Sequence, residues 1–169
     1  MSNHQTTIKN KYIVLPINMN SKTKKISFYE GDNLIFDFDA HIDFNTPQYY
    51  SYMNIERFKG RTVFITSEPR IDIRFTFVDA IPMAGIYKEE LRPMVHFTSR
   101  IGWINDPNGL TYYNGRYHMF FQHNPAGSDW GNMTWGHAIS DDLIHWHETD
   151  SALCPDGLGT MFSGSGIIV

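Results

Sequence analysis

Alternation of apolar and polar residues at a period of two is the feature that most limits how this chain can fold. It is clearest over residues 71–78, and similar short runs lie at 33–40 and 61–66. A period of two is that of a strand with one buried face, and no segment of about 11 residues keeps the 3.6-residue period of a helix. Clusters of Gly, Asn, Asp and Pro separate the runs. The sequence therefore predicts an all-β fold whose first part is a β-sandwich.

A second group of strands is expected further along the chain. Residues 109–113 and 116–124 flank an Asn114-Gly115 pair, the preferred type I′ turn of a two-residue β-hairpin. Further strands are predicted at 135–140 and 162–169, with a short turn at 141–144. The all-β character therefore extends to both parts of the chain.

Charge divides the chain into two regions of different composition. Residues 1–90 carry 11 basic and 11 acidic side chains, whereas residues 91–169 carry 3 and 7, with no lysine. The second region also holds six of the eight histidines and all four tryptophans. We therefore predict two domains, residues 1–90 and 91–169, with the boundary near 89–93.

Composition also excludes several classes of function. The net charge of −4 and the lack of a basic run argue against a nucleic-acid partner. No apolar stretch approaches the roughly 18 residues of a membrane span, and the N-terminus lacks the apolar core of a signal peptide. Cys154 is the only cysteine, so it has no intrachain disulfide partner. The histidines match no known ligand spacing, so we predict neither a metal site nor a cofactor.

The segment WINDPNG, residues 103–109, admits two interpretations. Its Asn, Asp, Pro and Gly residues form tight turns for purely local reasons. Alternatively, Asp106 is held extended by Pro107 and points its carboxylate into a pocket ringed by Trp103, Trp130 and Trp135. Aromatic rings stack on the C–H faces of sugars while carboxylates accept hydrogen bonds from hydroxyls, so this second interpretation predicts a carbohydrate site.

Five ordered segments carry a family resemblance: WINDPNG at 103–109, FFQHNP at 120–125, WGHA at 135–138, SDDLIHW at 140–146 and FSGS at 162–165. Together they resemble glycoside hydrolase family 32, which comprises invertases, levanases, inulinases and related β-fructosidases. Residues 1–90 resemble, more weakly, a β-sandwich module that precedes the catalytic domain in some bacterial fructan hydrolases. The family resemblance implies a five-bladed β-propeller and retaining hydrolysis of fructans or sucrose.

Within this resemblance, Asp106 matches the catalytic nucleophile. The substrate-binding positions that it implies are Trp103, Asn105, Gln122, Trp130, Phe162 and Ser163. Each also has a structural alternative: Gln122 facing solvent, Trp130 and Phe162 in a core, and Ser163 in a turn. His123 replaces the tyrosine that is commonest at its position, which bears on the detail of sugar binding rather than on the class of enzyme.

The family's Glu-Cys motif, which supplies the acid/base, and its Arg-Asp-Pro motif do not occur in the sequence. At about 40 to 50 residues per blade, residues 91–169 are enough for one blade and part of another. We therefore expect the N-terminal portion of a fructan hydrolase, inactive by itself, with an open blade edge that favours self-association. The resemblance also implies a secreted or periplasmic protein. A non-catalytic carbohydrate-binding domain and a structural β domain remain as alternatives.

Overall fold

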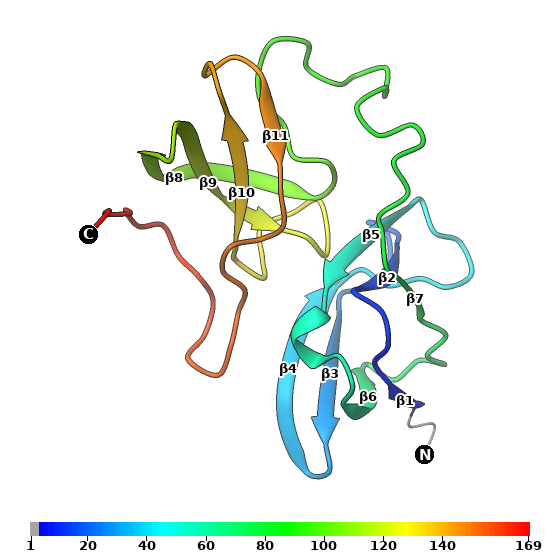
Figure 1. Cartoon of the computed structure of the whole chain (residues 1–169). Coiled ribbons are helices and arrows are strands. Elements are labelled where there is room, and N and C mark those ends of the chain that lie inside the picture. Colours follow the sequence, from blue (N-terminus) through cyan, green and yellow to red (C-terminus); the bar gives the residue numbers. More distant parts are fainter. Residues whose placement is uncertain (1–3) are drawn as a thin grey trace.

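The computed structural model describes residues 4–169 and contains three antiparallel sheets (Figure 1). The first sheet has the order β1-β6-β3-β4, with bounds His4–Thr7, Thr62–Glu68, Lys24–Glu30 and Asn33–Ala40. The second has the order β5-β2-β7, with bounds Tyr49–Asn54, Tyr12–Ile17 and Thr76–Val78. The third has the order β11-β10-β9-β8, with bounds Trp146–Glu148, Thr134–Ser140, Arg116–Asn124 and Trp103–Tyr113. The only helical element in the described part is a single 3₁₀ turn, η1 (Glu56–Phe58), and no helix there is long and apolar enough to cross a membrane.

The first two sheets enclose the main hydrophobic core, so the N-terminal part is built as a sandwich. Four phenylalanines form an aromatic cluster within this core, with ring centroids 5.5–6.4 Å apart: Phe28, Phe36, Phe38 and Phe58. The buried core residues come from this N-terminal part except for Ala126, which follows β9. The third sheet therefore contributes little to the core but inserts one of its loops into it.

The third sheet is a four-stranded meander, in which each strand pairs with its neighbours in sequence. Its first hairpin has the predicted turn, because Asn114 and Gly115 both have positive φ angles, 49° and 79°. The predicted strand at 135–140 is also confirmed, as β10. Residues 141–144 form the predicted turn, where the Asp142 carboxylate accepts hydrogen bonds from the backbone N–H groups of Ile144 and His145.

Two strand predictions are wrong. Residues 71–75 alternate in polarity, and Ile73 and Phe75 are buried, but only Thr76–Val78 pairs with a neighbouring strand. Residues 162–169 form no strand, and contacts near Gly109 and Trp135 hold part of this segment in an irregular conformation. Alternation reports which side chains face a core, but a strand also needs a partner for its backbone groups.

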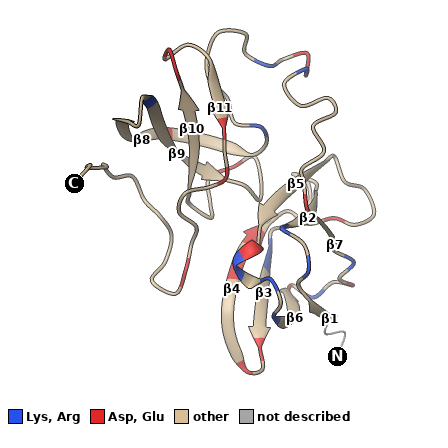
Figure 2. Cartoon of the chain, viewed as in Figure 1, with Lys and Arg blue, Asp and Glu red and all other residues tan. Residues whose placement is uncertain are grey.

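Polar contacts join the sandwich to the loop after β9. The Ser51 hydroxyl donates to the Pro125 carbonyl, and the Tyr49 hydroxyl lies 2.9 Å from the Ser128 hydroxyl oxygen. At a separate point, Asp150 accepts hydrogen bonds of 2.7 Å from both the Lys11 ammonium and the Tyr12 hydroxyl. Most Lys and Arg residues belong to the N-terminal part, as Figure 2 shows and as the sequence predicts.

Candidate active site

A bulge in β8 sets the direction of the Asp106 side chain. In the pairing of β8 with β9, Ile104 opposes His123 and Pro107 opposes Phe121. Two residues, Asn105 and Asp106, therefore stand opposite the single residue Gln122. A β-bulge of this kind re-aims a side chain and interrupts the ladder locally. The pairing with β9 thus places Asn105 and Asp106 across the ladder from Gln122, and the bulge leaves these two residues out of the regular alternation.

The Asp106 carboxylate is exposed and accepts a hydrogen bond on each oxygen. The Ser163 hydroxyl donates to Oδ2 at 2.8 Å, and the Asn105 side-chain amide donates to Oδ1 at 2.8 Å. Ser163 lies 57 residues from Asp106 in sequence. The two donors restrict the rotation of the carboxylate while its outer face stays open to solvent.

Gln122 is buried, at 3% exposure, so the alternative that it faces solvent is wrong. Its amide Nε2 donates to the Met161 carbonyl oxygen at 2.8 Å, while its Oε1 is buried without a hydrogen-bond partner in the described residues. The Met161 N–H donates in turn to the carbonyl of Met133. Gln122 therefore helps to hold the segment that leads into Phe162 and Ser163, and it retains one free acceptor.

Further hydrogen bonds fasten this C-terminal segment across the third sheet. The indole N–H of Trp135 donates to the Phe162 carbonyl at 2.9 Å, and the Gly109 N–H donates to the Gly164 carbonyl at 3.2 Å. The ring of Phe162 is 65% exposed, so the alternative that it belongs to a core is wrong. The sequence did not indicate these holding roles of Trp135 and Met161, because they depend on an irregular segment.

The cluster therefore contains five of the seven predicted site residues: Asn105, Asp106, Gln122, Phe162 and Ser163. Two are not joined to it: within residues 4–169 no hydrogen bond or aromatic contact connects Trp103 or Trp130 to the cluster. The Trp103 N–H donates to the Gly127 carbonyl at 2.9 Å. Trp130 is 64% exposed, which contradicts a core role, and it lines a separate groove beside β4.

The histidines of this region form hydrogen-bonded and stacked contacts. His118 Nδ1 lies 3.0 Å from His137 Nε2, and the His137 ring also stacks on Phe120 with centroids 4.5 Å apart. His123 is buried beside Phe121, and its Nε2 donates to the Ile101 carbonyl at 2.8 Å. Burial lowers the pKa of His123, which keeps its ring neutral. No group of three metal-binding side chains is found among the residues described.

The region that contains this cluster is similar to a known protein family. Residues 96–169 match the model of the glycosyl hydrolases family 32 N-terminal domain. The matched region is therefore similar to glycoside hydrolase family 32. This confirms the predicted resemblance, and the four-stranded meander is the form of a blade in the β-propeller of this family.

Several known proteins are 45–52% identical to this chain over the aligned residues. A levanase of Bacillus subtilis (strain 168) is 52% identical over 85 residues, covering 50% of this chain and 13% of the relative. An extracellular exo-inulinase of Aspergillus awamori is 51% identical over 92 residues, covering 52% of this chain and 17% of the relative. A fructan β-fructosidase of Streptococcus mutans is 45% identical over 109 residues, covering 64% of this chain and 7% of the relative.

Solved structures are also similar to part of this chain. The crystal structure of exo-inulinase from Aspergillus awamori is 52% identical in sequence, with a TM-score of 0.43. The match covers 47% of this chain and 16% of the inulinase chain. This chain thus spans less than a fifth of the length of each of these relatives.

Proposed function

We propose that residues 91–169 supply the nucleophile and part of the fructosyl-binding surface of a retaining β-fructosidase that acts on fructans or sucrose. In this proposal residues 1–90 form a separate β-sandwich domain that precedes the propeller. The observation that carries the proposal is the Asp106 carboxylate, exposed at a bulge and held on both oxygens by Asn105 and Ser163. The match of residues 96–169 to the family 32 model and the levanase, inulinase and fructan β-fructosidase names of the relatives support it.

The chemistry follows from what a held, exposed carboxylate can do. One Asp106 oxygen attacks the anomeric carbon of a fructosyl unit, the bond to the leaving group breaks, and a fructosyl ester forms on the carboxylate. Gln122 acts through the segment that it holds, because its side-chain amide donates to the Met161 carbonyl, two residues before Ser163. The exposed ring of Phe162 offers an apolar face to the C–H groups of the sugar.

Retaining hydrolysis also needs a second carboxyl about 5 to 5.5 Å from the nucleophile, to protonate the leaving oxygen and later to activate water. The family motif that supplies this group does not occur in residues 1–169. General acid–base catalysis contributes about 10² to 10⁴ in rate, so natural fructosides are expected to react very slowly with this chain. A donor whose leaving group departs without a proton avoids that requirement.

The test therefore uses β-fructofuranosyl fluoride with the 169-residue chain. Attack by Asp106 forms the ester bond and breaks the C–F bond, and fluoride leaves with the bonding electrons. We expect a burst of fluoride that approaches one equivalent of protein and no burst from Asp106→Asn. Asp141→Asn is the matched control, because it removes the same charge from an exposed turn. An equal burst from Asp106→Asn would contradict the nucleophile assignment.

Location outside the cell is part of the same proposal. Polymeric fructans do not cross membranes, so an enzyme that degrades them must act outside the cell. The Aspergillus awamori relative is named an extracellular exo-inulinase, which supports this placement. Detection of the protein in culture medium rather than in cell lysate, alongside a cytoplasmic marker, tests it.

A further inference from the structure

A groove of about 540 Å³ runs along the free edge of β4, away from Asp106. β4 is the last strand of its sheet, and residues Leu34 to His41 form one wall. The other wall is formed by parts of the loop after β9, including Trp130, and by parts of residues 155–160. Its volume lies in the range of about 300–1,000 Å³ that is usual for ligand sites. Residues from both parts of the chain therefore line this groove, which is separate from the candidate active site.

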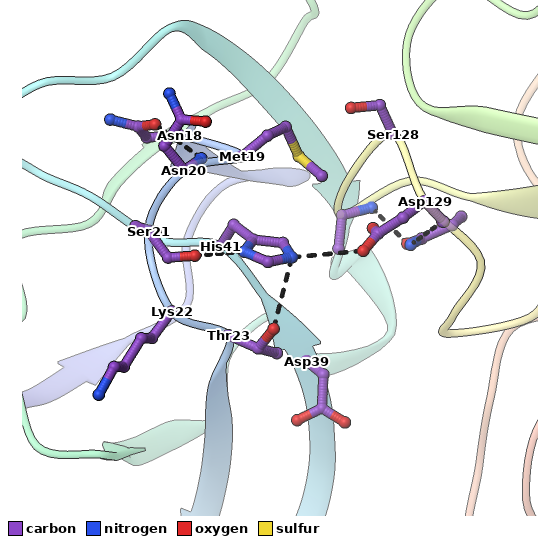
Figure 3. A network of polar contacts seen from close by, with 12 residues as sticks. Asn18, Met19, Asn20, Ser21, Lys22, Thr23, Asp39, His41, Ser128 and Asp129 are labelled. Atoms are coloured by element: carbon purple, nitrogen blue, oxygen red, sulfur yellow. Dashed lines mark hydrogen bonds and ion pairs between the residues drawn. The ribbon is translucent and has the colours of Figure 1, made fainter.

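Hydrogen bonds across the groove hold its two walls together. The side-chain amide of Asn132 pairs with the backbone of Asp39, accepting from its N–H at 3.0 Å and donating to its carbonyl at 2.8 Å. Figure 3 shows a second bridge, in which His41 Nε2 lies 3.3 Å from Asp129 Oδ2 while His41 Nδ1 lies 2.6 Å from the Ser21 carbonyl oxygen. These contacts fix the distance between β4 and the loop.

The groove combines apolar surface with hydrogen-bonding groups. Trp130 is 64% exposed on the loop side, and Leu34 is half exposed on the β4 side. Asp37 and Asp39 also line the groove, and the Lys25 ammonium donates to one oxygen of the Asp37 carboxylate at 3.2 Å. Because hydrogen-bonding directions alternate along an antiparallel strand, the N–H and C=O of Asp37 point the same way as those of Asp39, toward the groove.

We propose that this groove is a second carbohydrate site, which binds a stretch of a fructan chain at a distance from the reacting unit. The inference rests on the proposed function. An exposed indole suits the C–H face of a sugar, while carboxylates and a free strand edge suit its hydroxyls. Four acidic residues line the groove against one lysine, Lys25, so the groove disfavours phosphate and nucleic acid and suits a neutral oligosaccharide. Gly159 and Thr160 line the groove, and the same segment continues to Phe162 and Ser163 beside Asp106.

The experiment is calorimetric titration of the whole chain with levan-type and inulin-type fructo-oligosaccharides, with a cello-oligosaccharide as the control sugar. The groove variant is the double substitution Asp37→Ala/Asp39→Ala, which removes two carboxylates and the ion pair with Lys25 but leaves the Asn132 pairing with the backbone intact. Asp32→Ala is its control, because Asp32 is exposed in the turn before β4 and outside the groove. Thermal melts verify that each variant is folded.

We expect a fructo-oligosaccharide to bind the unaltered chain and Asp106→Asn with equal affinity. The double variant should bind roughly tenfold more weakly, whereas Asp32→Ala should bind normally. Affinity that is lost in Asp106→Asn but kept in the double variant would overturn the groove and leave the proposed function standing. Absence of binding to the unaltered chain, or equal binding of the cello-oligosaccharide, would also overturn the groove. The fluoride burst reports separately on Asp106.

Discussion

The packing of Gly136 against Phe121 gives a sharp test of how the third sheet holds the candidate site. Gly136 lies in the middle of β10 and pairs with Phe121 of β9, next to Gln122. A Cβ at position 136 would lie 2.8 Å from Cδ2 of the Phe121 ring and closer still to two other ring atoms. Because real Cβ atoms essentially never approach so closely, Gly136→Ala requires the ring or the strands to move.

The Phe121 ring has little room to move. It is 1% exposed and contacts the rings of Phe97 and His123, with centroids 5.2 and 5.7 Å away. Overpacking of this kind costs about 1–3 kcal/mol. Taking a cost of about 2 kcal/mol and a shift of about 2–4 °C per kcal/mol for a chain of this size, Tm should fall by roughly 4–8 °C.

Thermal unfolding followed by near-ultraviolet circular dichroism is the assay, since the aromatic signal reports on Phe121 and its neighbours. Gly157→Ala is the control, because a Cβ there has no atom within 4 Å and the residue lacks a positive φ. The double variant Gly136→Ala/Phe121→Leu should recover part of the loss, since a smaller side chain relieves the clash. Equal melting of Gly136→Ala and Gly157→Ala would refute the packing argument.

Three further predictions concern stability and pH. Asp106→Asn should change the free energy of unfolding by less than about 1 kcal/mol, because the position is exposed and the amide oxygen can still accept from Ser163; urea denaturation measures this. Burial lowers the pKa of His123, so below about pH 6.5 the unfolded state binds more protons than the folded state, and the free energy of unfolding should fall as the pH drops. The fall should be less steep in His123→Phe. An equal dependence on pH in the two proteins would contradict this. Burial raises the pKa of Asp150, but hydrogen bonds from Lys11 and Tyr12 leave that pKa below its usual value. Asp150→Asn should therefore lower the free energy of unfolding by about 1 kcal/mol at pH 7 and leave it unchanged at a pH below that lowered pKa. A loss of stability that is independent of pH would show that the charge of Asp150 plays no part.

Some local signals in the sequence predicted local features correctly. Asn114-Gly115 specifies its turn because both positions need a positive φ, which this pair adopts at low cost. Pro107 favours an extended backbone at Asp106, and Asp106 does lie in a strand. The all-β fold follows from the short period-two runs, which fit no helix.

Features that depend on long-range contacts were not predictable in this way. The bulge at Asn105 and Asp106 arises from the register with β9, and the Ser163 hydrogen bond joins residues far apart in sequence. Residues 162–169 form no strand because no strand of the described sheets pairs with their backbone. Trp130 was grouped with Asp106 by composition and resemblance, whereas the loop that carries it turns toward β4.

The residue that carries the fructosyl group after reaction with β-fructofuranosyl fluoride tests the central claim most directly. The chain is quenched in acid, digested with pepsin and mapped by tandem mass spectrometry. The account predicts one added fructosyl unit on Asp106, absent from Asp106→Asn and unaffected by Asp141→Asn. A label on another carboxylate, or a label that persists in Asp106→Asn, would contradict it.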